Sequence, residues 1–360
     1  MNTLFVTVQP WRNHALVIRF FSLRSKRGAL RSPRNADIFM NNNLPKPLVI
    51  ALEEHYWDPD LLATFPGREG KRVSDVERRL LDMGELRLRE MDEAGIDIQV
   101  LSHGAPGTQK LAPELATRMA RQTNDHLAEF IRTNPKRFAG LGLLPTPDPA
   151  AAADELERIV TRLDMKGAMV HGLTNGKFLD EKQFWPIFER AQAFDVPIYV
   201  HPSFPNPVVV DAYYKDYAAA YPELIGPALG FTLETATQAV RLVISGVFQK
   251  YPKLKIILGH LGEGIPFLLW RIDQSLSRSK SDTPFKETFR RNFYLTTSGN
   301  FSDTALTASI TEMGIDRIMF SVDWPYINNK DGTDWLKKAP ISEADRAAIF
   351  AGNAKRLLKL

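Results

Sequence analysis

A glutamate and a histidine stand two positions apart, at Glu53 and His55, directly after the short apolar run 48–52. Side chains two positions apart on a strand lie on the same face, so these two would point together and Glu54 would point away. Carboxylate oxygens and imidazole nitrogens are both ligands for divalent cations such as zinc and manganese. Two such residues alone are a weak indication of a metal site, because a single histidine is more often an ordinary core or surface residue.

Polar residues also follow other apolar runs of the chain. Five of the seven histidines, and one aspartate, stand at the ends of such runs: His55, His103, His171, His201, His260 and Asp323. A cation held jointly by Glu53, His55, His201 and Asp323 would keep positions open for a substrate, which distinguishes a catalytic metal site from a structural one. Asp323 could instead cap the segment that follows it, a common role for aspartate.

The other candidates would surround this metal site. His260 and Glu263, in the motif His-Leu-Gly-Glu, could form an acid–base pair in which the carboxylate orients the imidazole, or could mark a turn. We interpret them as the acid–base pair. His103 and His171 could line the substrate pocket or could support a metal ligand.

The fold must bring the ends of these runs together. Eight short apolar runs, rich in β-branched residues, alternate with longer amphipathic stretches: 48–52, 96–101, 138–144, 167–170, 196–200, 254–258, 293–297 and 317–321. This alternation is typical of βα units and a parallel sheet. The composition stays the same along all eight repeats, with no sign of a second domain. The sequence therefore predicts an α/β protein with a single (β/α)8 TIM barrel. Catalytic residues of such barrels lie at the carboxyl ends of the strands, and the long segment 202–230 would cover that face.

The net charge of +4 does not indicate a nucleic-acid partner. Residues 1–39 contain seven basic side chains and one acidic side chain, which leaves 39 basic and 41 acidic side chains in residues 40–360. The rest of the chain therefore has no excess of positive charge with which to bind phosphates. No apolar run is long enough to cross a bilayer, so we expect no membrane partner. The chain has no cysteine, which excludes disulfides, thiolate metal ligands and a cysteine nucleophile.

Residues 1–39 are predicted to lie outside the fold. Their Arg-rich and acid-poor composition is shared with organelle transit peptides, and Arg19 interrupts their apolar stretch. We interpret them as a disordered or non-native N-terminal extension, with the catalytic domain at 40–360 starting at Met40. A targeting segment is the alternative. The expected location of the enzyme is the cytoplasm.

Six motifs, in order, resemble those of the amidohydrolase-related nonoxidative decarboxylases that act on hydroxybenzoates such as 2,6- and 2,3-dihydroxybenzoate. They are Ala-Leu-Glu-Glu-His at 51–55, Tyr-Val-His-Pro at 199–202, Ile-Leu-Gly-His-Leu-Gly-Glu-Gly at 257–264, Trp-Arg-Ile-Asp at 270–273, Thr-Thr-Ser-Gly-Asn at 296–300 and Phe-Ser-Val-Asp-Trp-Pro at 320–325. The opening Glu-x-His, where hydrolytic relatives carry His-x-His, points to this branch. No lysine ends the fourth run, so we do not expect a two-metal site with a carbamylated lysine.

The resemblance implies one divalent metal ion, zinc or manganese, and no organic cofactor. The implied metal ligands are Glu53, His55, His201 and Asp323. The substrate would be a small aromatic carboxylic acid that binds the cation through its carboxylate and an ortho hydroxyl, and CO2 would be released. Asp323 would deliver a proton to the ring carbon, and His260, oriented by Glu263, would assist.

Four further residues are expected around the substrate: Arg271, His171, His103 and Tyr326. Arg271 resembles the family's contact to the substrate carboxylate, although from the sequence alone it could form an ion pair with Asp273. His171 and His103 stand where the 2,6-dihydroxybenzoate enzymes would carry other residues. The resemblance therefore indicates the reaction class and leaves the particular hydroxybenzoate open. It also implies a homodimer or a homotetramer.

Two other functions fit the same residues. A metal-dependent hydrolase or hydratase of the same superfamily would use a metal-bound water, with His260 as the general base. A noncatalytic barrel that only binds a metal would be a binding protein. The joint presence of His260, Glu263 and Asp323 argues against this last alternative.

Overall fold

All pairings between the strands of the structure are parallel. The strands are β1 (Ile50–Tyr56), β2 (Ile98–His103), β3 (Phe138–Gly140), β4 (Gly142–Leu143), β5 (Ala168–His171), β6 (Pro197–His201), β7 (Lys255–Leu258), β8 (Phe293–Thr296) and β9 (Ile318–Met319). They match the eight apolar runs in order, because β3 and β4 are two halves of one run. The computed structural model describes residues 47–65, 67, 71–279 and 284–360. The predicted extension at 1–39 and the predicted start at Met40 lie outside these residues.

The strands close into a ring. They pair in the orders β1-β2-β3 and β4-β5-β6-β7-β8-β9. The amide of Leu141, between β3 and β4, donates to the carbonyl oxygen of Leu101 in β2 at 2.9 Å. A parallel bridge joins Leu52 of β1 to Ser321, which lies just after β9. These two links connect the sheets at both ends, and the predicted (β/α)8 barrel is therefore confirmed.

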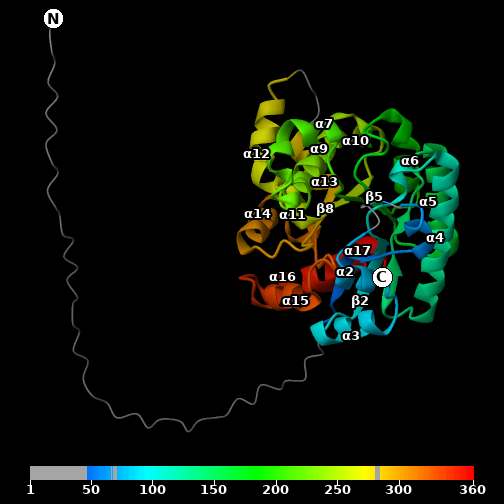
Figure 1. The fold of residues 1–360 in the computed structure, drawn as a ribbon. Helices are drawn as coiled ribbons and strands as arrows, with labels where there is room; N and C mark the ends of the chain where they lie inside the picture. The colour runs from blue at the N-terminus through cyan, green and yellow to red at the C-terminus, as the bar shows by residue number, and fades with distance from the viewer. Residues whose placement is uncertain (1–46, 66, 68–70, 280–283) are drawn as a thin grey trace, which may run out of the picture. The chain divides into compact units, whose positions relative to one another are not determined.

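Helices follow the strands in sequence and lie around the ring (Figure 1). They are α1 (Pro59–Leu62), α2 (Ser74–Leu81), α3 (Glu85–Ala94), α4 (Pro113–Thr133), α5 (Pro149–Leu163), α6 (Trp185–Ala193), α9 (Gly230–Ile244), α10 (Val247–Lys250), α11 (His260–Glu263), α12 (Ile265–Leu276), α13 (Phe285–Asn292), α14 (Asp303–Met313), α15 (Asn329–Lys338), α16 (Glu343–Ala347) and α17 (Asn353–Leu358). Local chemistry sets several of their ends. The Asp148 side chain caps the start of α5, and Gly95 ends α3 in a left-handed conformation with φ of 78°.

Two layers of apolar side chains surround the strands. The inner layer fills the ring with side chains such as Ile50, Val100, Met169 and Met319, and α17 adds Leu357 to it. The larger outer layer packs the other strand face against the helices. Strands that are buried on both faces favour continuous apolar runs over strict alternation, which explains why the strand segments of this chain are so uniformly apolar.

Strand β1 contains a bulge where it reaches the candidate site. It advances three residues, from Ala51 to Glu54, while β2 advances two. Within the bulge Glu53 has a left-handed backbone with φ of 59°. Because Leu52 belongs to the inner layer, strict alternation would turn Glu54 into the ring and Glu53 out of it. The bulge shifts the alternation by one residue and turns Glu53 inward.

The long segment after β6 forms a series of short helices at the carboxyl end of the strands. These are α7 (Pro207–Val209), a π-helical turn (Val210–Tyr214), α8 (Lys215–Ala218) and a 3-10 turn (Pro222–Ile225). The segment exposes large apolar side chains, with Val208 at 74% and Tyr213 at 73% exposure. Within the described residues, none of the helices has the length and apolar character needed to span a membrane.

Candidate metal centre and active site

Four of the predicted residues converge at the carboxyl end of the barrel. One ligand atom from each of Glu53, His55, His201 and Asp323 lies within 4.8 Å of the other three. His201 Nε2 is 3.3 Å from Glu53 Oε1, and His55 Nε2 is 3.3 Å from Asp323 Oδ1. The first three residues are buried, whereas the Asp323 side chain keeps 18% exposure. The strand ends of β1 and β6 and the loop after β9 bring them together.

Three of the four atoms that face one another in this centre are buried and lack hydrogen-bond partners among the described residues. These are Glu53 Oε1, His55 Nε2 and Asp323 Oδ1, which accept or donate no hydrogen bond. A buried polar atom without a partner costs roughly 1–3 kcal/mol, and a charged one costs more. Three such atoms around one point are therefore unfavourable unless a bound group satisfies them. Two imidazole nitrogens and two carboxylate oxygens suit zinc or manganese, so these residues fit one divalent cation.

Three hydroxyl groups hold the other oxygen of the Glu53 carboxylate. Tyr199 and Ser298 donate hydrogen bonds to Oε2, and Thr296 Oγ1 donates to the same oxygen at 3.4 Å. Burial raises the pKa of Glu53, and the nearby His260 imidazole opposes that rise. With Oε2 held in this way, Oε1 is directed at the centre, where a cation would favour the charged carboxylate.

Glu54 points away from the centre, as predicted, and holds the loop that carries Asp323. Its two oxygens accept the backbone amides on either side of Asp323, at 3.0 and 3.2 Å. Burial raises the pKa of Glu54 to about 8. Arg87 lies 4.0 Å above the Trp324 ring and donates to the carbonyl oxygen of His55 at 2.6 Å. These contacts of Arg87 could not be predicted from the sequence, because they depend on packing between α3 and the barrel.

A chain of hydrogen bonds determines which nitrogen of His201 is protonated. His201 Nδ1 lies 2.7 Å from the carbonyl oxygen of Pro202, so this nitrogen carries the proton. His171 Nε2 lies 2.8 Å from the carbonyl oxygen of His103 and is protonated for the same reason. Burial lowers the pKa of His171 to about 3, so its Nδ1 has a lone pair, which faces His201 Nδ1 at 3.0 Å. His201 Nε2 is left with its lone pair toward the centre, as a metal ligand requires.

Ser102 and His103 are neighbours on β2 and point to opposite faces of the strand. Ser102 Oγ lies 3.2 Å from His55 Nδ1 on the inner face. His103 consequently points to the outer face, where its ring lies 5.4 Å from the ring of Tyr56. The structure therefore does not bring the His103 side chain, which we expected near the substrate, to the centre. Only its carbonyl oxygen reaches the site, through His171.

The predicted pair of His260 and Glu263 is in contact. His260 Nδ1 lies 2.7 Å from Glu263 Oε1, and Thr232 donates to the other carboxylate oxygen at 2.9 Å. Burial lowers the pKa of His260, but the carboxylates of Glu263, Glu53 and Asp323 together outweigh it and raise that pKa to about 10. The imidazole is thus a protonated group at the rim of the centre, with 26% exposure.

Left-handed backbone conformations are concentrated at this site. Glu53, His260, Glu263, Ser298 and Asp323 have φ values of 59°, 51°, 54°, 26° and 72°. Each such conformation costs about 1–3 kcal/mol in a residue other than glycine and persists only where surrounding contacts enforce it. Their concentration here indicates that the positions of these side chains, more than backbone stability, determine the local structure.

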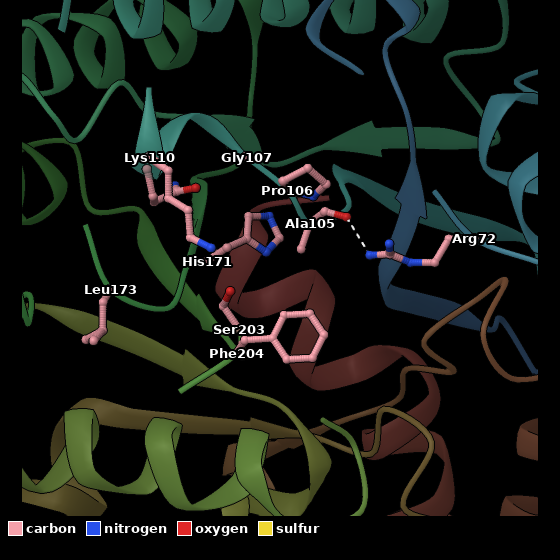
Figure 2. A pocket seen from close by; sticks show the side chains of 10 residues that line it. Arg72, Ala105, Pro106, Gly107, Lys110, His171, Leu173, Ser203 and Phe204 are labelled. Carbon is pink, nitrogen blue, oxygen red and sulfur yellow. Dashed lines mark hydrogen bonds between the residues drawn. The ribbon is translucent and has the colours of Figure 1, made fainter. Parts of the chain in front are cut away.

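An inner pocket opens beside the centre (Figure 2). It is lined by Arg72, Ala105, Pro106, Gly107, Gln109, Lys110, His171, Leu173, Ser203 and Phe204. Arg72 donates to the carbonyl oxygen of Ala105 at 2.9 Å and to the hydroxyl oxygen of Tyr326 at 3.3 Å. The Tyr326 ring lies 5.9 Å from that of His55, so Tyr326 connects Arg72 to the centre. Sequence analysis missed Arg72, because it precedes α2 in a loop and follows no strand.

Arg271 lies on α12 with its side chain exposed. Among the described residues it forms no hydrogen bond and no ion pair, and Asp273 instead accepts the backbone amide of Lys286 at 2.9 Å. Within one chain, Arg271 therefore forms neither the ion pair with Asp273 nor a contact with the substrate site.

A parallel barrel with a buried carboxylate–imidazole centre at its carboxyl end defines an amidohydrolase-type protein, and the family comparison agrees with it. The amidohydrolase family model matches residues 50–360. The chain belongs to this family.

Among its relatives, the gamma-resorcylate decarboxylase of Polaromonas sp. is 44% identical over 86% of this chain and 98% of its own length. The gamma-resorcylate decarboxylase of a Rhizobium species is 40% identical, with the same coverage of both chains. Among solved structures, a 2,6-dihydroxybenzoate decarboxylase complexed with 2,6-dihydroxybenzoate has a TM-score of 0.79 and 39% identity, and covers 88% of this chain and all of its own. The dihydroxybenzoic acid decarboxylase of Polaromonas sp., with bound manganese and 2-nitroresorcinol, has a TM-score of 0.80 and 42% identity over 88% of this chain and 98% of its own.

Proposed function

We propose that this chain is a metal-dependent nonoxidative decarboxylase that releases CO2 from an ortho-hydroxybenzoate. One observation carries the proposal: three buried, unpaired ligand atoms of Glu53, His55 and Asp323 converge at the carboxyl end of the barrel. Decarboxylases of dihydroxybenzoates at 40–44% identity support the reaction class. The relative with bound manganese makes manganese the first cation to test, with zinc as the second.

The four ligands proposed for the cation are Glu53, His55, His201 and Asp323. When bound, the cation would supply Lewis-acid chemistry to the carboxylate end of the substrate. His171 would act through His201, because its Nδ1 accepts a hydrogen bond from the Nδ1–H of His201 and so leaves the Nε2 lone pair of His201 directed at the cation.

Asp323 is proposed as the proton donor, because its carboxyl group is the ligand with the most solvent contact. It would transfer a proton to the ring carbon that bears the carboxylate, using an electron pair of the aromatic ring to form the C–H bond. The bond to the carboxylate carbon then breaks, its electron pair restores the aromatic ring, and CO2 leaves. Asp323 remains as a carboxylate and is reprotonated before the next turnover.

Three positively charged side chains would hold the anionic substrate: His260 at the centre, and Arg72 and Lys110 in the inner pocket. The protonated imidazole of His260, oriented by Glu263 at 2.7 Å, would donate to a phenolic oxygen or return a proton to Asp323. Arg72 and Lys110 line the inner pocket and favour a negatively charged ligand there. Tyr326, bonded to Arg72, would lie against the ring.

The deciding experiment is a panel assay. The purified chain, loaded separately with Mn2+, Zn2+ and Mg2+, would be incubated with ortho-hydroxybenzoates and with matched benzoates that lack the ortho hydroxyl. We expect CO2 from the ortho-hydroxy acids alone. Opening of a lactone without any CO2 release would identify a hydrolase, for which the pair of His260 and Glu263 could activate water. Full metal occupancy without turnover of either panel would identify a binding protein.

We also propose a homo-oligomer that buries one face of α12. Phe267, Trp270 and Leu268 on this helix are 84%, 62% and 44% exposed, and Arg271 is exposed beside them. Clustered apolar side chains of this size on a surface are typical of subunit interfaces. Phe267→Asp should reduce the molecular mass measured by light scattering, whereas an unchanged mass would place the interface elsewhere.

For the domain boundary, we propose that residues 40–360 form the catalytic domain and act in the cytoplasm. All proposed site residues lie between 53 and 326. A chain starting at Met40 should therefore fold and retain full kcat/KM. Loss of folding on this truncation would assign a structural role to residues 1–39.

A further inference from the structure

A second hollow adjoins the inner pocket at the carboxyl end of the barrel. This outer hollow has a volume of about 480 Å3, within the range of roughly 300–1,000 Å3 that is common for small-molecule sites. Its lining consists of Lys110, Leu173, Gly176, Ser203, Phe204, Pro205, Asn206, Pro207, Val210, Asp211 and Lys215. Four residues line both spaces: Lys110, Leu173, Ser203 and Phe204. The two spaces are therefore neighbours that share part of their walls, and Figure 2 labels these shared side chains together with His171.

The walls of the outer hollow are built by loops that follow β2, β5 and β6, which are the loops that form substrate sites in (β/α)8 barrels. Hydrogen bonds connect two of these loops, since the amide of Asn175 donates to the carbonyl oxygen of Gln109 at 3.1 Å. At Gly172, with φ of 55°, a Cβ atom would lie 2.5 Å from Ser203 Cβ, so the third loop packs directly against the second. This close packing indicates a preformed wall.

Three of the polar side chains of the outer hollow have partners within the loop that follows β6. Asp211 and Lys215 form an ion pair at 3.6 Å, and Asn206 Oδ1 accepts the amide of Val208 at 2.9 Å. Beyond these groups and the side chains of Lys110 and Ser203 at the boundary with the inner pocket, the lining is mainly apolar and comes from Leu173, Phe204, Pro205, Pro207 and Val210. Phe204 keeps 45% exposure, with its ring in edge contact with Phe231 at 5.2 Å.

We propose that the outer hollow is a substrate subsite for an apolar substituent on the hydroxybenzoate ring. This inference rests on the proposed decarboxylase function and names the substrate class: an ortho-hydroxybenzoate with an alkyl or aryl group of several carbon atoms. The charged end of the substrate is held near the metal centre between Arg72 and Lys110. Its substituent passes Leu173 and Phe204 into the outer hollow, where it buries apolar surface that a single dihydroxybenzoate ring would leave empty.

The experiment compares 2,6-dihydroxybenzoate with its 3- and 4-alkyl derivatives, from methyl to pentyl, on the manganese-loaded full chain. One buried methylene contributes about 0.8 kcal/mol, or about fourfold in kcat/KM. We expect kcat/KM to rise by about that factor per carbon over at least three carbons in one of the two series. Val210→Trp should remove this dependence and leave kcat/KM of the unsubstituted acid within twofold. Val208→Trp is the matched control, because Val208 lies two positions away, is 74% exposed and does not line the hollow.

If kcat/KM stays constant or falls with the length of the alkyl chain in both series, the subsite proposal is wrong and the proposed decarboxylase function is unaffected. Equal effects of the two tryptophan variants would overturn the subsite proposal as well. Binding of resorcinol and pentylresorcinols, measured by calorimetry, tests the subsite without any turnover. The wild-type chain could release no CO2 from any acid and still bind pentylresorcinol at least tenfold more tightly than resorcinol. If Val210→Trp then lost this difference in affinity, the subsite would be supported and the proposed reaction would be wrong. If Val210→Trp does not fold, Val210→Phe provides the same comparison with a smaller change.

Discussion

The metal centre and the cluster of Asp58, Asp60 and His126 contain the same kinds of ligand. Both combine imidazole with carboxylates whose atoms lie within 4.8 Å of one another. They are also neighbours in sequence, because Asp58 follows His55 by three residues. Proximity and residue type alone therefore do not distinguish them.

The difference lies in how their polar atoms are satisfied. Asp58 Oδ1 accepts the amides of Asp60 and Leu61, both at 3.0 Å, and Oδ2 lies 2.7 Å from His126 Nδ1. This cluster thus caps α1 and ties it to α4 without a ligand. In the metal centre, by contrast, Glu53 Oε1 and two other buried atoms have no partner within the described part of the chain. Buried and unpaired ligand atoms, more than acidic residues as such, mark the site that needs a cation.

The largest expected difference between the two clusters is in turnover. Asp323→Asn removes the proposed proton donor and should lower kcat with the hydroxybenzoate by at least about 1,000-fold, a loss in the range expected for general acid catalysis. The same change at Asp60, Asp60→Asn, should leave kcat within twofold. Circular dichroism should show both variants folded. An Asp323→Asn variant with near-normal kcat would remove Asp323 from both of its proposed roles.

The second-largest expected difference between the two clusters is in the amount of metal that each one binds. We expect one manganese ion per chain in the wild type and in His126→Ala, measured by elemental analysis after gel filtration. Glu53→Gln replaces a charged ligand by a neutral one and should weaken manganese binding by at least about 100-fold, so that the variant loses the ion during filtration. Two ions per chain in the wild type, with one lost in His126→Ala, would show that the satisfied cluster also binds metal.

Much of the fold and of the centre could be predicted from the sequence. Each strand lies within, or within a few residues of, its apolar run, and all four proposed ligands follow from polar residues at strand ends. The prediction that Glu53 and His55 point together into the barrel was correct, but for a reason that the sequence does not contain. Alternation from Leu52 favours the opposite orientation, and the bulge in β1 reverses it. Bulges depend on pairing with the neighbouring strand, and a single chain segment does not specify them.

The side chains that support the centre were harder to predict. His103 ends a strand just as His171 does, but Ser102 takes the inner face of β2 and leaves His103 outside. Arg72 reaches the inner pocket from a loop, and nothing in its local sequence marks it as a site residue. Such contacts join positions far apart in the chain, and residue types and spacing carry no information about them. The three hydroxyl groups that hold Glu53 are different, because Tyr199, Thr296 and Ser298 all stand within the motifs that carry the family resemblance and could have indicated them.

A smaller effect is expected at His171, which holds His201 in position. His171→Phe removes one of the two acceptors of the His201 Nδ1–H, the other being the Pro202 carbonyl oxygen, and should raise the dissociation constant for manganese by about tenfold, as is typical for residues behind a metal ligand. His171→Asn retains an oxygen acceptor and should bind manganese nearly as well as the wild type. Competition with a chelator measures both values. A His171→Phe variant with unchanged affinity would show that Pro202 alone positions His201, and equal losses in both variants would indicate a packing role.

The smallest effect concerns the stability of the satisfied cluster and its dependence on pH. The hydrogen bond to Asp58 raises the pKa of His126 above its usual value of 6.5. The protonated form is therefore favoured in the folded state, so its contribution to stability is complete below about pH 6.5 and is lost as the pH rises through the folded pKa. Because the His126 side chain is 50% exposed, solvent screens this ion pair, and at most about 1 kcal/mol is expected. His126→Gln should therefore lower the Tm by up to about 2 °C at pH 5.5 and by less at pH 9. A Tm difference that grows with pH would mean that a different interaction holds α4 to α1.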